Sequence, residues 1–222
     1  MKTALLGGTF DPIHYGHLYI AREASRILCL DQVRFLVSGI PPHKRQVPIS
    51  DSRHRLAMTE LALLNEENFF VSNEELKRGG LSYTIDTLEN AAEELGHENI
   101  CFIAGSDVLR DIHSWKSTDR LLEEFCLFFV QRPGEQVDVK NISLSSKLRK
   151  RIHQIGTETK PKIKPGISWL ATLDSPGISS SALREKIRRH ESDLARFLPG
   201  NVLEYALEHG LYENRYGNIK KS

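Results

Sequence analysis

The 222-residue sequence lacks several features that mark whole classes of protein. It has three cysteines, Cys29, Cys101 and Cys126, and no Cys-x-x-Cys pair, which argues against a disulfide framework or a zinc site and favours reduced thiols. No run approaches the roughly 18–20 apolar residues of a membrane span, and no signal peptide is recognisable, because the apolar start leads at once into a glycine pair. The formal net charge is only +1, so any anion site must be local. A globular, cytoplasmic protein without a membrane anchor is expected.

Two common phosphate-binding motifs are also missing. The sequence contains no Gly-x-x-x-x-Gly-Lys-Ser/Thr loop and no Gly-x-Gly-x-x-Gly fingerprint, so neither a P-loop kinase nor a dinucleotide-dependent dehydrogenase is predicted. There is no internal repeat.

Short apolar runs alternate with helical patterns along the chain. Strands are expected at 3–6, 33–37, 69–71, 100–104, 126–130 and 168–173, and helices at 17–28, 51–64, 84–95, 179–189 and 202–209. This alternation predicts an α/β fold, an open parallel sheet with helices on both faces. Such sheets bind ligands beyond the carboxyl ends of their strands. We expect the helix at 51–64 to turn Leu56, Ala57, Leu61 and Leu64 inward.

The most informative stretch follows the first expected strand and reads GGTFDPIHYGH over residues 7–17. Its glycine pair lets the backbone approach a ligand closely, and its Asp-Pro pair favours a turn. His14 and His17 then lie three residues apart on one face at the start of a helix. Free N–H groups and the helix dipole favour phosphate there. A metal-binding pair and a purely structural turn are the alternatives, but no third ligand is placed nearby.

This stretch resembles the signature of the nucleotidylyltransferase superfamily, whose H-x-G-H element is shared with class I aminoacyl-tRNA synthetases. It is most similar to bacterial nicotinate-nucleotide adenylyltransferases. The resemblance implies a Rossmann-like fold and the transfer of AMP from ATP to nicotinate mononucleotide, giving nicotinate adenine dinucleotide and pyrophosphate for NAD biosynthesis. It also implies ATP contacts, with His14 and His17 on the phosphates. The ATP-binding residues expected in this stretch are Gly7, Gly8, Thr9, Phe10, His14 and His17.

Two later segments extend the resemblance to the acceptor. Lys44, in a Pro-Pro-His-Lys element, reads on its own as a solvent-exposed loop lysine, and the resemblance makes it a phosphate contact. Ser82, Tyr83 and Thr84 precede a helix, where their backbone amides could bind a carboxylate, or Ser82 or Thr84 could simply cap the helix. The resemblance implies that this segment recognises the nicotinate carboxylate.

Polar residues also follow the fourth expected strand. Gly105 and Asp107 stand at its end, where a carboxylate can bind two ribose hydroxyls, and Trp115 follows eight residues after Asp107. The indole of Trp115 could stack on a planar ring or pack into the core. The resemblance implies that Asp107 binds the adenosine ribose and that Trp115 lies beside the nicotinate ring.

The last expected strand is followed by a serine-rich helix start. Ser179, Ser180 and Ser181 precede Arg184, which could form a second phosphate-binding helix terminus or an ordinary serine cap. The resemblance implies that these residues bind ATP and that Arg184 acts with His14, His17 and Lys44 in catalysis. Mg²⁺ is expected to be bound mainly through the ATP phosphates, with no protein metal site.

A basic segment is left unexplained by the resemblance. Residues 140–164 hold eight Lys or Arg and a single acidic residue, Glu158. A solvated surface insertion is the expected explanation, because the aromatic residues needed to stack on RNA bases are missing. We therefore expect one domain over residues 1–222, with a basic insertion near 136–167 and a small helical part from about 179. Whether the chain forms a homo-oligomer stays open.

Three other functions remain as rivals. Phosphopantetheine adenylyltransferase belongs to the same superfamily, but it is shorter and lacks the Ser-Tyr-Thr segment. The others are a catalytically silent nucleotide-binding regulator and an RNA-binding protein that uses the basic segment. The intact histidine pair argues against silence, and the expected small-molecule partners are ATP and nicotinate mononucleotide.

Overall fold

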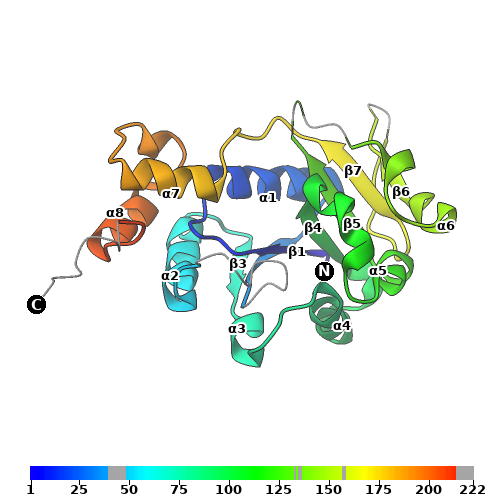
Figure 1. Ribbon diagram of the computed structural model, residues 1–222. Helices are drawn as coiled ribbons and strands as arrows, with labels where there is room; N and C mark the ends of the chain where they lie inside the picture. The colour runs from blue at the N-terminus through cyan, green and yellow to red at the C-terminus, as the bar shows by residue number, and fades with distance from the viewer. Residues whose placement is uncertain (40–48, 133, 135–136, 157–158, 214–222) are drawn as a thin grey trace, which may run out of the picture.

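The computed structural model describes residues 1–39, 49–132, 134, 137–156 and 159–213. Its parallel strands form one open sheet in the order β3-β2-β1-β4-β5-β7-β6 (Figure 1). The strands are β1 (Thr3–Gly8), β2 (Gln32–Val37), β3 (Phe69–Ser72), β4 (Ile100–Gly105), β5 (Cys126–Gln131), β6 (Ile152–Gln154) and β7 (Ser168–Thr172). The order reverses between β1 and β4, so the switch point lies beyond the carboxyl ends of these two strands.

Helices cover both faces of the sheet, as the sequence predicts (Figure 1). They are α1 (Tyr15–Leu28), α2 (Ser52–Leu63), α3 (Glu74–Arg78), α4 (Thr84–Leu95), α5 (Thr118–Glu124), α6 (Ser146–Arg149), α7 (Ser180–Arg188) and α8 (Gly200–Glu208). Alternate strand residues face two separate cores. Leu6 packs with side chains of α1, α2, α7 and α8, whereas its neighbour Leu5 packs with those of α4 and α5.

The buried face of α2 is only partly the expected one, since Leu56 and Leu61 pack against the core as predicted. The helix begins after Asp51, as predicted, with the Asp51 carboxylate accepting the N–H of Arg53 at 2.9 Å. However, Leu64 is 70% exposed, whereas Met58 and Leu63 are buried. The sequence pattern misleads here because α2 packs against α8 as well as against β2 and β3, so apolar residues are needed on more than one side of the helix.

The basic segment is more structured than a solvated insertion. It contains a 3-10 turn (Val139–Asn141), α6 and the edge strand β6, which pairs in parallel with β7. Several of its cations bind within the protein: Arg149 donates to the carbonyl oxygen of Lys140 at 2.7 Å, Arg151 to that of Gly166 at 3.0 Å, and Lys147 pairs with Glu123. Within the described chain, no helix has the length and apolar character needed to span a membrane.

Candidate active site

The predicted histidine pair caps the start of α1. The N-cap residue is His14, whose backbone is extended (φ −151°, ψ 169°). Its Nδ1 accepts the backbone N–H of Gly16 at 3.1 Å, and the Nδ1 of His17 accepts the N–H of His14 at 3.2 Å. The two rings stack with their centroids 3.8 Å apart. The structure therefore places both imidazoles side by side, just beyond the carboxyl end of β1.

These hydrogen bonds fix the tautomer of both rings. An imidazole nitrogen that accepts an N–H carries no proton, so we infer that each neutral ring carries its proton on Nε2. His14 is 2% exposed. Its burial, reinforced by the nearby cation of Arg132, lowers its pKa to about 4. His14 is thus neutral at physiological pH and offers an N–H donor of the kind that phosphate oxygens accept.

Gly16 is required by the position of the His14 ring. A Cβ atom at Gly16 would lie 2.9 Å from both Cε1 and Nδ1 of His14, which is shorter than a van der Waals contact. The middle glycine of the H-x-G-H element therefore makes room for the first histidine of that element.

The glycine pair at the end of β1 makes room for aromatic rings of the protein. A Cβ at Gly7 would lie 2.9 Å from the ring of Phe102, and one at Gly8 would lie 2.6 Å from that of Phe10. Phe10 is only 1% exposed and packs edge-on against His17, with ring centroids 5.1 Å apart. Because its ring is buried, Phe10 can meet a nucleotide only through its backbone.

The turn before the histidines is held by side chains from distant elements. Arg55 Nη1 donates to the carbonyl oxygen of Thr9 at 2.8 Å, Arg184 Nη1 to that of Asp11 at 2.8 Å, and Ser180 Oγ to that of Pro12 at 2.9 Å. The sequence analysis did not identify Arg55, a 2% exposed cation of α2 whose pKa is lowered by burial. A lone arginine in a helical pattern gives no signal of such a role.

The serine-rich start of α7 serves mainly internal contacts. Ser179 is the N-cap residue, and its Oγ accepts the N–H of Ala182 at 3.2 Å. Ser180 binds the turn, and the Oγ of Ser181 accepts from Arg184 Nη2 at 3.2 Å. Ser179 is therefore an ordinary helix cap. Direct contacts of these serine side chains with ATP stay a prediction.

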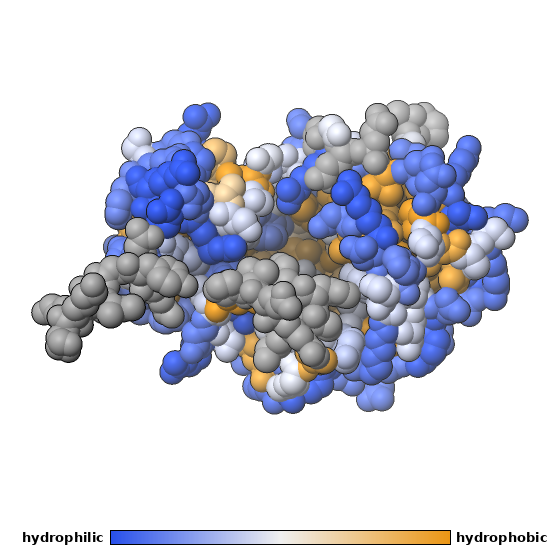
Figure 2. Space-filling view, in the orientation of Figure 1, coloured by the Kyte–Doolittle hydropathy of each residue, from blue (hydrophilic) through white to orange (hydrophobic). Residues whose placement is uncertain are grey.

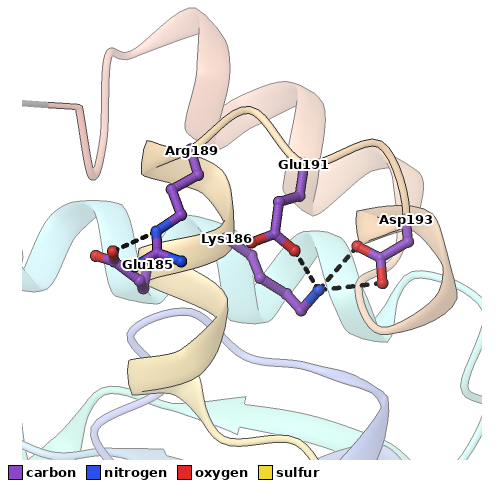
Figure 3. A network of polar contacts seen from close by, with 5 residues as sticks. All are labelled: Glu185, Lys186, Arg189, Glu191 and Asp193. Atoms are coloured by element: carbon purple, nitrogen blue, oxygen red, sulfur yellow. Dashed lines mark hydrogen bonds and ion pairs between the residues drawn. The ribbon is translucent and has the colours of Figure 1, made fainter.

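A network of charges joins α7 to the residues that follow it (Figure 3). Lys186 Nζ binds both carboxylate oxygens of Asp193, at 3.0 and 3.1 Å, and also binds Glu191. The same ammonium lies 5.7 Å from the ring centroid of Phe197. The carbonyl oxygen of Phe197 accepts the N–H of Tyr15 at 2.9 Å. The helical C-terminal part is therefore attached directly to the H-x-G-H helix.

Asp107 lies directly after β4, and its contact with a ribose stays a prediction. β4 ends at Gly105, and a Cβ there would lie 2.4 Å from Asp107 Oδ1. The glycine thus allows the exposed carboxylate to fold back over the end of the strand. Because β4 neighbours β1, Asp107 and the histidine pair lie on the two sides of the switch point.

The predicted carboxylate-binding segment opens α4 without a side-chain cap. The N-cap residue is Tyr83, and in the described chain neither Ser82 nor Thr84 provides the ordinary cap that was the alternative. The buried Oγ of Ser82 has no hydrogen-bond partner among the described residues. The first turn of α4 therefore keeps N–H groups that can bind an anion.

Trp115 lies close to the start of α4. It is half-buried against the core cluster that includes side chains of α4 and α5, so part of its indole packs into the core. The next residue, Lys116, binds Asp86 at 2.6 Å and lies 4.9 Å from the ring centroid of Tyr83. This bridge, which the sequence analysis did not identify, links the loop that carries Trp115 to α4.

Unpartnered hydroxyl groups gather at this edge of the sheet. In the described chain, the buried Oγ atoms without a partner include those of Ser38, Ser106 and Ser175, which follow β2, β4 and β7. Buried hydroxyls are normally hydrogen-bonded, so these atoms suit a polar ligand. In the space-filling view the face toward the viewer is hollowed near its centre, with an apolar floor between hydrophilic flanks (Figure 2).

Arg132 is a further cation at this edge. It directly follows β5 and is half-buried, and it lies near enough to His14 to affect the pKa of that imidazole. The sequence analysis did not identify it, although an arginine directly after an apolar strand is the signal that could have done so. Lys44 lies outside the described residues. Within them, no group of three His, Cys, Asp or Glu side chains could hold a metal ion.

Comparisons with known proteins show the family to which the chain belongs. The model of the cytidylyltransferase-like family matches residues 5–186. A "Probable nicotinate-nucleotide adenylyltransferase" of Clostridium tetani is 38% identical over 213 residues, covering 95% of this chain and 98% of the relative. A relative with the same name from Thermus thermophilus is 36% identical over 212 residues, covering 96% of this chain and 100% of the relative.

A solved structure shares the fold. The nicotinic acid mononucleotide adenylyltransferase of Plasmodium falciparum complexed with NaAD superimposes with a TM-score of 0.74 at 20% identity, covering 96% of this chain and 98% of the other. The match to the family model and the identity to the full-length relatives decide the family. The chain belongs to the cytidylyltransferase-like family and, within it, to the nicotinate-nucleotide adenylyltransferases.

Proposed function

We propose that this chain transfers the AMP part of ATP to nicotinate mononucleotide, releasing pyrophosphate and forming nicotinate adenine dinucleotide in NAD biosynthesis. The observation that carries the proposal is the stacked His14–His17 pair at the switch point, with both Nδ1 atoms bound to backbone N–H groups. In a chain of this family, that arrangement suits two N–H donors directed at a triphosphate.

The reaction needs positioning more than proton transfer. The phosphate of the acceptor is ionised, so its oxygen can attack the α-phosphorus in line without a strong general base, and the bond to the departing pyrophosphate breaks. His17 binds the α-phosphate and stabilises the charge that develops there, while His14 and Arg184 hold the β- and γ-phosphates. Lys44, outside the described residues, is assigned to the phosphates as well.

Positive charge must come from groups other than His14. Because that ring is neutral, it contributes a hydrogen bond and no charge. The charge is supplied by Arg184, by the half-buried Arg132 and by Mg²⁺ that enters with ATP. The donor set at this edge consists mainly of imidazoles, hydroxyls and guanidinium groups, which suits a magnesium ion held by phosphate oxygens.

The acceptor lies on the α4 side of the switch point. The uncapped first turn of α4 binds the nicotinate carboxylate through the amides of Ser82, Tyr83 and Thr84. Trp115 lies against the nicotinate ring, and Asp107 binds the ribose of the adenosine. The whole chain acts as one nucleotidyltransferase domain. Its three free thiols suit a reducing compartment, and we place the reaction in the cytoplasm.

The direct test combines an acceptor panel with one substitution. The protein is incubated with Mg²⁺, ATP and each of nicotinate mononucleotide, nicotinamide mononucleotide and phosphopantetheine, and pyrophosphate release is measured. Nicotinate mononucleotide should give the highest kcat/KM, because helix amides favour a carboxylate over a neutral amide. Equal values for the two pyridine nucleotides would refute the role of α4, and preference for phosphopantetheine would refute the acceptor.

His17→Ala tests the chemical step. We expect kcat to fall about 10²–10⁴-fold, the scale of a lost transition-state donor. His153→Ala is the matched control, since this exposed imidazole lies on β6, at the far edge of the sheet. Normal turnover by folded His17→Ala protein would remove His17 from the mechanism.

A further inference from the structure

Asp11 is a buried carboxylate within the turn that precedes the histidine pair. It is 3% exposed. Its Oδ2 accepts the backbone N–H of Ser50 at 3.1 Å, and its Oδ1 accepts the hydroxyl of Tyr212 at 2.8 Å. The buried guanidinium of Arg55 lies near enough to interact with it electrostatically. Since a buried carboxylate is costly unless it is paired and hydrogen-bonded, the conformation of this turn depends on these partners.

Tyr212 reaches Asp11 from the other end of the described chain. The two residues are 201 positions apart. Leu211 is buried in the core beside α1, and its N–H donates to the carbonyl oxygen of Ala206 in α8 at 2.8 Å. Burial, followed by the charge of Asp11, raises the pKa of Tyr212. Its hydroxyl therefore keeps its proton and remains a hydrogen-bond donor throughout the physiological range.

The position of Asp11 is transmitted to the imidazoles through a short, fixed segment. Only Pro12 and Ile13 separate it from His14. The Pro12 carbonyl oxygen is bound by Ser180, and Ile13 is fully buried. The segment therefore cannot absorb a displacement of Asp11 locally, and a shift there moves the N-cap of α1.

We propose that Tyr212 is a positioning residue for the adenylyl transfer, which holds the H-x-G-H helix in register through Asp11. The inference rests on the function proposed above, but it assigns a further role to Tyr212, a residue beyond the end of α8. Three contacts of the described residues attach the turn to the C-terminal part: Tyr212 donates to the Asp11 carboxylate, Arg184 to the Asp11 carbonyl oxygen, and Ser180 to the Pro12 carbonyl oxygen.

The test is Tyr212→Phe, which removes only the hydroxyl. The matched control is Tyr205→Phe. The hydroxyl of Tyr205 also makes a hydrogen bond in the C-terminal part, with His54 Nδ1 at 3.0 Å, but this bond does not involve Asp11. We expect kcat per binding site to fall about 10–100-fold in Tyr212→Phe, the effect of reacting groups displaced by about 1 Å. KM for nicotinate mononucleotide should change less than about threefold, and Tyr205→Phe should keep wild-type kcat.

A double-mutant cycle separates positioning from general folding. If Tyr212 acts through the histidine helix, its hydroxyl should matter little once the imidazole of His17 is gone, so Tyr212→Phe should lower kcat less than about threefold in the His17→Ala background. If Tyr212→Phe lowers kcat by the same factor with and without the His17 imidazole, the proposal is overturned. A Tyr212→Phe enzyme with wild-type kcat would also overturn it. Should Tyr212→Phe fail to fold, Asp11→Ala removes the carboxylate that accepts this hydrogen bond and must lower kcat at least as much.

Binding of a non-hydrolysable ATP analogue, measured by calorimetry, makes the proposal independent of the acceptor. If the wild-type protein binds the analogue but forms no nicotinate adenine dinucleotide, the proposed function fails. In that case the positioning role of Tyr212 is tested by the affinity of each variant for the ATP analogue. Tyr212→Phe should weaken analogue binding at least about fivefold at unchanged stoichiometry relative to Tyr205→Phe. Equal affinities of these two variants would overturn the role of Tyr212.

Discussion

The substitution Gly16→Ala should separate catalysis from stability, because it adds a single methyl group where the His14 ring lies. That methyl carbon would stand 2.9 Å from both Cε1 and Nδ1 of His14. The ring cannot move aside while keeping its hydrogen bond, since Nδ1 accepts the N–H of Gly16 itself at 3.1 Å. The ring must therefore rotate or shift, and the contact that fixes its tautomer must weaken.

Opposing terms set the stability of this variant. Loss of the side-chain cap costs about 1 kcal/mol, and overpacking beside a ring that is 2% exposed adds about 1–3 kcal/mol. Alanine in place of a helical glycine returns up to about 1 kcal/mol. The net loss is about 1–4 kcal/mol, which corresponds to a Tm lowered by roughly 2–16 °C for a chain of this size. The protein should therefore remain folded at 25 °C.

Activity should respond much more strongly than stability. A displaced or wrongly oriented imidazole removes one donor to the phosphates, and the loss of such a donor costs about 10²–10³-fold in kcat. The assay is pyrophosphate release with nicotinate mononucleotide at saturating ATP, alongside thermal unfolding followed by circular dichroism. Gly200→Ala is the matched control, because Gly200 also stands at a helix start and a Cβ there meets nothing within 4 Å.

Two results would refute this reasoning. Gly16→Ala protein with kcat within about threefold of wild type would show that the His14 ring does not need its observed position. A similar loss of kcat in Gly200→Ala would show that the effect belongs to helix-start glycines in general and not to the ring.

Three other substitutions test separate parts of the site. The pKa of His14 is lowered by burial from the ordinary 6.5 to about 4, so the unfolded chain takes up its proton first and stability falls as the pH is lowered. Between pH 7 and pH 5 this contributes about 2 kcal/mol, which His14→Asn should remove from the urea-unfolding free energy. Gly105→Ala should raise KM for ATP about tenfold or more, because its Cβ would lie 2.4 Å from Asp107 Oδ1; an unchanged KM contradicts the ribose role. Lys116→Ala should change stability by less than about 1 kcal/mol, since its bridge to Asp86 is solvent-exposed, while raising KM for nicotinate mononucleotide; an unaffected KM removes Lys116 from the acceptor site.

The fold could be predicted from the sequence because its signals are local. Apolar runs such as 100–104 and 126–130 mark strands buried on both faces, and the helices between them have regular apolar spacing. β6 escaped prediction because it has three residues, of which only Ile152 is buried. An edge strand this short is determined by its pairing with β7, which no local pattern records.

The candidate site was predictable only in part, for a related reason. Residues whose chemistry is visible in a contiguous motif, such as His14 and His17, could be identified from the sequence. The supporting contacts of Arg55 and Tyr212 could not, because these residues come from separate elements and act on the turn through tertiary contacts. The reason for Gly7 and Gly8 could not be predicted either. The rings of Phe102 and Phe10, which would clash with a Cβ at these positions, are brought there only by the folded structure.

The histidine pair depends on residues that lie far away in the sequence, near the end of the described chain. The motif at residues 7–17 supplies the histidines, but their backbone is held by side chains of α2, α7 and the residues after α8. Ser180 and Arg184 act across 168 and 173 positions, and Tyr212 acts across 201. Contacts of such long range form only once the chain is nearly folded, because loop closure must precede them. Loss of these contacts affects the turn and not the pairing of the strands, so a chain ending before Leu211 should keep the sheet while losing alignment of the histidine pair.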